Sequence, residues 1–343
     1  MAEPVAAELW IAGGRLLGDQ GTRAGALGIA QGRVVGEAEK PPRGARIVDA
    51  GGLLLLPGFV DAHVHLALAG RLREMARAEL DGGIAAVLDL GAPESLLPLP
   101  LGPLRVRFAG PLLTAPGGYP TQSWGAAGYG LELDSPAAAQ AAVQRLAKAG
   151  ARFVKLAFDA RYPVLDAQVA RIAADEAHRL GLAVAAHALD AEAVRRALEA
   201  GADVLAHAPV ERLSDELVRE IGARWIISTL RVFGGGEAAL DNLRRLRAAG
   251  ARVVYGTDLG NEGTVPGIDA GELSLLLQAG LTAREVIDSA TSAAAELLGE
   301  PDLGHLRAGA SACVIGVPEQ ALDDVRLLAR PPLVLAGGAL PPQ

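Results

Sequence analysis

The sequence of 343 residues predicts an α/β protein built on a (β/α)8 TIM-like barrel, with a small β-sandwich formed by the N- and C-terminal segments. Two observations support this fold class. From residue 59 onward, short apolar runs alternate with longer amphipathic runs, which is typical of parallel strands covered by helices. The two ends instead show short strand-like runs separated by Gly-rich turns. We therefore expect residues 57–302 to form the barrel and residues 1–56 and 303–343 to form the sandwich.

The barrel prediction depends on a count of the apolar runs. Most of them precede a helical pattern, for example at 166–181, 190–201 and 237–250. The first two of these patterns begin with an Asp suited to an N-cap, and several end in Gly, a common helix stop. Eight units match a (β/α)8 barrel, and a doubly wound open sheet is the alternative. The eight runs are "FVDAHVH", "IAAVLDLG", "LRVRFAG", "ARFVKLAF", "LAVAAHA", "ADVLAHA", "ARWIISTL" and "ARVVYGTD".

Two connecting segments differ from the repeated strand–helix units. The pattern at 282–299 predicts a helix that leads from the barrel back to the sandwich. The segment 111–134 is too long for an ordinary loop and contains Tyr119, Trp124 and Tyr129 among glycines. We expect it to form a mobile wall over the mouth of the barrel. An irregular surface loop with an aromatic anchor is the alternative.

Composition limits the class of protein and its partners. Half of the residues are apolar and 3% are aromatic, so the core must consist mainly of Ala, Leu and Val. The net charge of −8, without a long basic run, argues against nucleic acid or an anionic membrane as a partner. A single cysteine, Cys313, and an N-terminal segment without a secretory pattern lead us to expect a cytoplasmic protein. Whether the chain forms a homo-oligomer stays open.

Polar residues occur where the predicted strands end. Residues at the carboxyl ends of barrel strands line the active site, and four of the six histidines fall at such positions. Imidazoles and carboxylates are ligands of Zn²⁺ and similar ions, so the pattern predicts a pair of divalent metal ions. The residues, in chain order, are His63, His65, Lys155, His187, His207 and Asp258.

Lys155 is the unusual member of this set. An ammonium group is a poor metal ligand, but burial beside metal charge lowers a lysine pKa and exposes a nucleophilic amine. Such an amine can add carbon dioxide and form a carbamate, which offers two oxygens to two metal ions. The alternative is a strand-end lysine that reaches solvent or pairs with Asp258.

Six segments together resemble the amidohydrolase superfamily of metal-dependent hydrolases over nearly the whole chain. The most similar branch includes the Xaa-Pro dipeptidases and the imidazolonepropionase-related hydrolases. One departure is "GASACVIG", which lacks the Ala-Asp pair that is frequent in the last sandwich strands of the family. The six segments are "LPGFVDAHVHL", "FVKLAF", "AVAAHA", "VLAHAP", "VVYGTDLG" and "LGHLRAGASACVIG".

The resemblance implies a role for each residue of the set. His63, His65 and Asp258 would hold one metal ion, His187 and His207 a second, and carboxylated Lys155 would bridge them. The ions are expected to be Zn²⁺, and a metal-bridging hydroxide would be the nucleophile. Asp258 would take its proton and deliver it to the leaving group.

Several further residues have structural interpretations. We interpret Asp61 as structural, and Asp89 as either a turn cap or a residue near the pocket. Thr229 and Thr257 are ligand-orienting residues or ordinary β-branched strand residues, and we favour the second interpretation slightly. His178 and His305 are expected to lie outside the site.

Substrate recognition is expected to come from the loops and to concern a small molecule. Arg231 and the pair Arg161–Tyr162 follow strands and would reach a substrate carboxylate, with salt bridges at the rim as the alternative. Tyr119 would donate a hydrogen bond to a developing oxyanion.

The leading functional hypothesis is a binuclear metal hydrolase that cleaves an amide, such as a dipeptide, an N-acyl amino acid or a cyclic amide. Lactone or phosphotriester hydrolysis on the same centre stays open. A mononuclear deaminase of a heterocycle, which Lys155 makes less attractive, and a non-enzymatic binding relative stay open as well.

Overall fold

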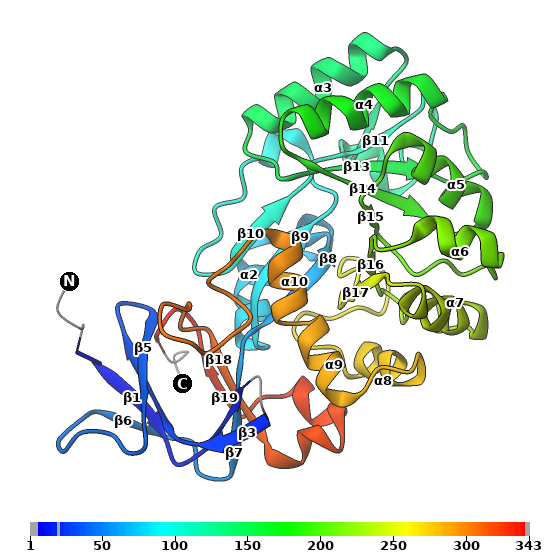
Figure 1. Ribbon diagram of the computed structural model, residues 1–343. Helices are drawn as coiled ribbons and strands as arrows, with labels where there is room; N and C mark the ends of the chain where they lie inside the picture. The colour runs from blue at the N-terminus through cyan, green and yellow to red at the C-terminus, as the bar shows by residue number, and fades with distance from the viewer. Residues whose placement is uncertain (1–5, 19–20, 340–343) are drawn as a thin grey trace.

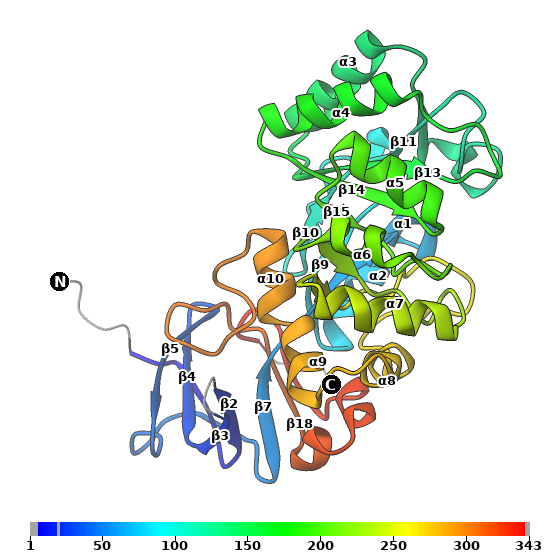
Figure 2. The same cartoon turned by 45° about the vertical axis from the view of Figure 1, so that its right-hand side comes forward.

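The structure is a computed structural model that describes residues 6–18 and 21–339 (Figure 1). Parallel strands with helices along their outer side form the larger part, and two sheets made from both ends of the chain lie beside it (Figure 1). Figure 2 shows the same separation after a turn of 45°. The domain boundaries at 56/57 and 302/303 stay a prediction, and residues 1–5 and 340–343 of the terminal segments lie outside the described residues.

The strands of the larger part are β8 (Phe59–Val64), β9 (Ile84–Asp89), β10 (Arg105–Phe108), β11 (Leu112–Thr114), β12 (Gly130–Glu132), β13 (Phe153–Phe158), β14 (Ala183–Ala188), β15 (Val204–Leu205), β16 (Trp225–Ile227) and β17 (Arg252–Val254). They pair in parallel as β10-β9-β8 and as β12-β11-β13-β14-β15-β16-β17. Backbone bonds join the two sheets at both edges, because the Arg152 N–H donates to the Phe108 carbonyl at 3.1 Å and the Ala62 N–H to the Tyr255 carbonyl at 3.0 Å. The strands therefore close on themselves, as in a barrel and unlike an open doubly wound sheet.

The long segment 111–134 contains two short strands and is therefore not the irregular surface loop of the alternative interpretation. Its residues Leu112–Thr114 form β11, which pairs with β13, so that Leu112 lies beside Lys155. β12 then pairs with β11 in parallel, and a 3-10 turn, η2 (Trp124–Ala127), lies between them. The apolar "LLT" run takes this position because it satisfies the backbone groups of β13 beyond the end of the short β10.

The helices are α1 (Leu66–Ala69), α2 (Leu72–Asp81), α3 (Pro136–Lys148), α4 (Ala167–Arg179), α5 (Ala191–Ala200), α6 (Asp215–Ile221), α7 (Glu237–Ala248), α8 (Ala270–Gln278), α9 (Ala283–Ser289) and α10 (Ser292–Leu298), with 3-10 turns η1 (Glu94–Leu96), η3 (Glu319–Leu322) and η4 (Val325–Ala329). The predicted Asp caps are confirmed, since Asp166 accepts from two N–H groups at the start of α4 and Asp190 accepts from Ala193 N–H in α5. Gly201 ends α5 in the left-handed conformation. Within the described residues, no helix combines the length and apolar character that a membrane span requires.

The prediction of one helix at 282–299 is wrong, because the helix breaks between α9 and α10. The Ser289 carbonyl turns to accept from Tyr255 N–H at 3.1 Å, and the Ala290 carbonyl accepts from Val60 N–H at 2.7 Å. The Thr291 hydroxyl donates to the Ile287 carbonyl at 2.7 Å and so competes with the helical bond. The break therefore serves the barrel, because it frees two carbonyls for backbone N–H groups near the start of β8 and directly after β17.

Two sheets lie beside the barrel, and the second of them combines strands from both ends of the chain. One contains β5 (Arg33–Ala38), β4 (Ala26–Ala30), β1 (Leu9–Ala12) and β6 (Ile47–Asp49), in that order. The other contains β19 (Leu333–Leu335), β18 (Val314–Pro318), β7 (Leu53–Pro57), β2 (Arg15–Gly18) and β3 (Gly21–Ala24), in that order. Buried residues of both sheets share one hydrophobic cluster, so the C-terminal strands complete a core that the N-terminal strands begin.

Gly58 joins this part to the barrel. It lies between β7, which pairs with β18, and β8, the first barrel strand. A Cβ at Gly58 would lie 2.9 Å from Ala85 Cβ, so the crossing requires a residue without a side chain. The Pro-Gly pair thus places the histidines of β8 directly after the change of sheet.

The loop that follows β15 offers a test of how the fold supports the barrel mouth. Asn242 on α7 is fully buried, accepts from Leu213 N–H at 3.0 Å and donates to the carbonyls of Pro209 and Glu211 at 2.9 and 2.6 Å. We expect Asn242→Ala to lower the free energy of unfolding by about 2–4 kcal/mol, because three backbone groups lose their partner. Urea denaturation measures this. The exposed Gln320→Ala is the control, and equal stability of both variants would contradict this role of Asn242.

Candidate metal centre

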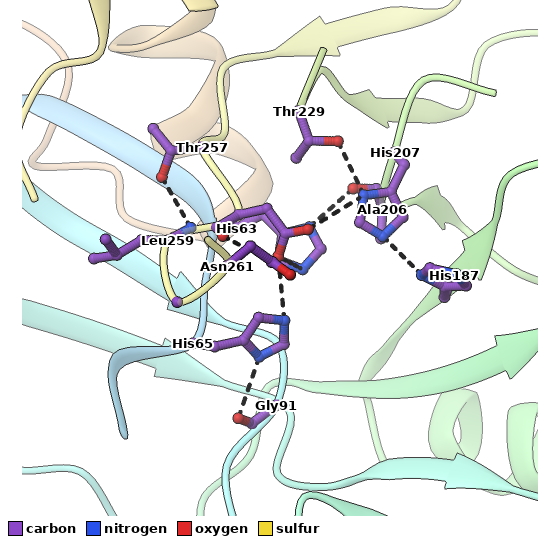
Figure 3. Close-up of polar contacts among 12 residues, drawn as sticks. His63, His65, Gly91, His187, Ala206, His207, Thr229, Thr257, Leu259 and Asn261 are labelled. Carbon is purple, nitrogen blue, oxygen red and sulfur yellow. Dashed lines mark hydrogen bonds and ion pairs between the residues drawn. The ribbon is translucent and has the colours of Figure 1, made fainter. Parts of the chain in front are cut away.

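His63 lies near the end of β8 and His65 directly follows this strand, and their rings lie close together, with centroids 5.2 Å apart (Figure 3). The Nδ1 atom of His63 lies 2.9 Å from the Ala206 carbonyl, and that of His65 lies 3.3 Å from the Gly91 carbonyl. A carbonyl accepts only, so both Nδ1 atoms carry the proton, and each Nε2 keeps a lone pair. Each Nε2 lies 3.3 Å from Oδ1 of Asp258.

These three side chains form a site that suits a cation. Nε2 of His63 and Oδ1 of Asp258 are buried without a hydrogen-bond partner, and ligand atoms of His63, His65 and Asp258 all lie within 4.8 Å of one another. Acceptors that face each other without a hydrogen repel, and a positive ion between them removes the repulsion. Burial alone would raise the pKa of Asp258, but positive charge on His63 and His65 would hold it well below its usual range, and an ion between them would act in the same direction.

His187 and His207 form a second pair of converging nitrogens. Nδ1 of His187 lies 2.9 Å from Nε2 of His207, and Nδ1 of His207 lies 2.9 Å from the Thr229 hydroxyl (Figure 3). If the His207 Nδ1–H donates to Thr229, its Nε2 accepts the hydrogen of His187 Nδ1–H, and an ion could take the place of this hydrogen when His187 carries its proton on Nε2 instead. Burial lowers the pKa of His187 to about 3 and that of His207 well below its usual value, so both rings are neutral ligands at pH 7.

Lys155 lies inside the barrel on β13 and is 1% exposed. Burial lowers the pKa of its amine to about 7, although Asp258 opposes the shift. Among the described residues, no ion pair within 4.0 Å involves Lys155, so the alternative of a direct Lys155–Asp258 pair is not formed. A substantial neutral fraction of this amine at neutral pH is what reaction with carbon dioxide would require.

Asp61 connects β8, which carries His63, to the segment after β17, which carries Asp258. From the sequence, Asp61 was interpreted only as structural. Its carboxylate accepts from His63 N–H at 3.0 Å, from Thr257 N–H at 3.0 Å and from the Thr257 hydroxyl at 2.5 Å. Asp258 N–H in turn donates to the His63 carbonyl at 2.8 Å. A charged residue within an apolar run was the available signal, because a buried carboxylate needs hydrogen-bond donors.

Asp89 has a similar role for His65. It accepts from Gly91 N–H at 3.0 Å and from Leu66 N–H at 3.0 Å, and so holds the turn whose carbonyl faces His65. A Cβ at Gly91 would lie 2.5 Å from the ring of His65. Only glycine leaves room for the imidazole here. Asp89 therefore caps a turn, one of the two expected roles.

The two threonines do not share one role. The Thr229 hydroxyl contacts the ring of His207, so our preference for an ordinary strand residue is wrong for Thr229. Thr257 binds Asp61 instead of a histidine. Thr229 has φ of +39° and Asp258 has φ of +55°, a left-handed conformation that is uncommon outside glycine and that positions functional side chains in many proteins. Sequence patterns give no sign of these dihedral angles.

The four residues assigned to substrate recognition lie on loops at the rim. The Tyr119 ring stacks on His187 with centroids 4.7 Å apart, and burial raises the pKa of its hydroxyl to about 12. The Tyr162 ring lies 5.8 Å from that of Tyr119. Arg161 forms an ion pair with Asp159, and Arg231 forms one with Asp269. Both guanidiniums thus make the rim salt bridges that were the alternative interpretation, and their contact with substrate stays a prediction.

The other two histidines lie apart from the cluster. His178 on α4 contacts Asp203 at 2.9 Å and is 41% exposed. Nε2 of His305 donates to the Pro301 carbonyl at 3.0 Å, in the segment that leads into β18.

Comparisons with known proteins find relatives that cover most of the chain. The model of the amidohydrolase family matches residues 54–332. An uncharacterized protein of Mycobacterium tuberculosis is 30% identical, over 91% of this chain and 90% of its own length. The imidazolonepropionase of Streptomyces avermitilis is 28% identical, over 81% of this chain and 76% of its own. A solved Xaa-Pro dipeptidase with bound methionine has the same fold, with a TM-score of 0.82, 20% identity and coverage of 98% of this chain and 100% of that chain.

Asp61 provides a test of the centre that does not require a substrate. We expect Asp61→Asn to weaken divalent metal binding about 10–100-fold, because asparagine has one acceptor oxygen where three donors converge. Competition with a chromophoric zinc chelator measures the affinity. The exposed Asp175→Asn, which loses only its contact with Arg171, is the matched control. Unchanged affinity in Asp61→Asn would show that the two strands position their ligands without it.

Proposed function

The chain belongs to the amidohydrolase family and is a hydrolase that acts on C–N bonds, and from this premise we propose that it cleaves an amide at a binuclear metal centre. One observation supports the proposal above all. Around a buried lysine on β13, side chains on or directly after four other barrel strands bring together four imidazoles and one carboxylate. Neutral imidazoles and a carboxylate are a typical donor set for Zn²⁺.

In this proposal the ligands divide into two sets. His63, His65 and Asp258 would hold the first ion, and His187 and His207 would hold the second. Lys155, after its amine has added carbon dioxide to form a carbamate, would contribute oxygen ligands. When bound, two such ions polarise a carbonyl and make water nucleophilic at neutral pH.

The proton steps belong to Asp258. Its Oδ1 atom faces the two histidines of β8, and Oδ2 lies 4.0 Å from Nδ1 of His207. We assign to Asp258 the removal of a proton from the attacking water and its delivery to the leaving nitrogen. An amine is a poor leaving group unless it is protonated, so the second transfer is as necessary as the first.

The rim residues would orient the substrate. The Tyr119 hydroxyl keeps its proton at neutral pH, accepts from Trp124 Nε1 at 3.1 Å and has its own O–H left to donate to the carbonyl oxygen. Arg231 would bind a substrate carboxylate if its guanidinium shares its donors between the ligand and Asp269, and Arg161–Tyr162 would assist. Dipeptides and N-acyl amino acids offer both the carbonyl oxygen and the carboxylate, and cyclic amides offer the carbonyl oxygen.

Lys155 decides between a binuclear centre and a mononuclear one. Protein prepared with zinc and bicarbonate should contain about two ions per chain, and Lys155→Ala about one, with kcat/KM at least roughly 100-fold lower. Elemental analysis and amide hydrolysis measure the two quantities. The exposed Lys148→Ala is the matched control. A single ion that is retained in Lys155→Ala would exclude the carbamate-bridged centre.

Arg231 is tested by the charge of the substrate. We expect Arg231→Ala to raise KM about tenfold for N-benzoylglycine and to leave KM for its uncharged methylamide unchanged, because only the first can pair with a guanidinium. Steady-state kinetics on both compounds measures this. The exposed Arg326→Ala, which also loses an ion pair, controls for general charge effects. Equal changes for both substrates would assign Arg231 to the structure of the rim alone.

A further inference from the structure

Aromatic residues gather at the metal centre although the chain contains few of them. The whole sequence contains three tryptophans, four tyrosines and five phenylalanines, and its hydrophobic core consists mostly of Ala, Leu and Val. Aromatic rings near the histidine cluster therefore form a local feature and do not reflect the general composition. These residues are Tyr119, Trp124, Tyr129, Tyr162 and Phe233.

Three of the rings contact a different histidine each. Trp124 lies edge-on to His65 with centroids 5.2 Å apart. Tyr119 stacks on His187 at 4.7 Å, and the Phe233 ring is 4.9 Å from His207. Tyr119 and Trp124 come from the segment between β11 and β12, whereas Phe233 follows β16. We call Tyr119, Trp124 and Phe233 the aromatic wall.

The indole of Trp124 has no free hydrogen-bond donor for a ligand, because its N–H already donates within the protein. The only indole donor, Nε1 of Trp124, is occupied by the Tyr119 hydroxyl at 3.1 Å. Tyr129, which is 9% exposed, contacts Trp124 at 5.9 Å and supports it from behind. Trp124 can therefore offer a ligand the face or edge of its ring but no hydrogen bond.

The wall is incompletely buried. Tyr119, Trp124 and Phe233 are half-buried, whereas the histidines that they contact are at most 5% exposed. Large rings that remain partly exposed beside a polar site retain apolar surface that a ligand can cover. A flat apolar group would cover it best, since rings pack edge-to-face or offset against other rings.

We propose that the aromatic wall selects amides that carry a flat apolar group, such as a phenyl ring, next to the scissile bond. This inference rests on the proposed amide hydrolysis and names its substrate class. The competing explanation is that the rings only pack the loops together. In that case the loss of Trp124 would impair all substrates by the same factor.

The test compares N-benzoylglycine with N-acetylglycine, which differ only in the acyl group. We expect kcat/KM to be at least about tenfold higher for the benzoyl compound, because a phenyl ring buries more apolar surface than a methyl group. Trp124→Ala should reduce this ratio to about 1–3, and Trp124→Phe should retain most of it. Trp225→Phe is the control, because Trp225 lies at the start of β16 beneath Arg252, at 3.7 Å. A preference for the acetyl compound, or a ratio unchanged in Trp124→Ala, would overturn the proposal.

Binding of products separates the two proposals. Calorimetric titration of the zinc-loaded protein with benzoate and with acetate needs no catalysis, and we expect benzoate to bind about tenfold more tightly. Trp124→Ala should abolish this difference. If no dipeptide, N-acyl amino acid or cyclic amide is cleaved but benzoate is still preferred through Trp124, the proposed amide hydrolysis fails while the proposed role of the aromatic wall in binding is retained. Equal binding of benzoate and acetate to the unmodified protein would contradict the proposed selection of flat apolar groups by the aromatic wall.

Discussion

The contact between Oδ1 of Asp258 and the Nε2 atoms of His63 and His65, at 3.3 Å each, is the constraint on which the rest of the site depends. All three atoms are acceptors, and they face one another in a buried space. Without a cation such a contact is unfavourable, since charge and lone pairs are desolvated without compensation. The surrounding structure must therefore hold the three side chains in place by other means.

Backbone and buried carboxylates perform this task. The carbonyls of Ala206 and Gly91 define which ring nitrogen of each histidine carries the proton. Asp61 binds both the strand of His63 and the turn of Asp258, and Asp89 holds the turn of Gly91. Each of these bonds fixes a ligand before any ion arrives, which lowers the entropic cost of binding it. Many ordinary hydrogen bonds of the barrel thus support a contact that would be unfavourable by itself.

The same arrangement separates chemistry from recognition. The ligands stand on strands or directly after their ends and are nearly inaccessible, whereas the rings that cover them stand on loops and remain partly exposed. Strands position atoms accurately because their backbone groups are paired on both sides, and loops can change without disturbing them. A hydrolase of this design can therefore change its substrate through residues such as Trp124 and Phe233 while its metal ligands stay in place.

The sequence by itself determined the strand-helix alternation and which polar residues occupy strand ends, because period and position along the chain are local properties. It therefore identified His63, His65, Lys155, His187, His207 and Asp258 as one group. It did not reveal the break between α9 and α10, the strand β11 within the long segment, or the contact of Thr229 with His207. Nor did it indicate that Arg161 and Arg231 already have carboxylate partners. Only the structure decided these points, since most of them depend on hydrogen bonds or ion pairs between segments that meet when the barrel closes, and the Arg161–Asp159 pair depends on the conformation of its loop.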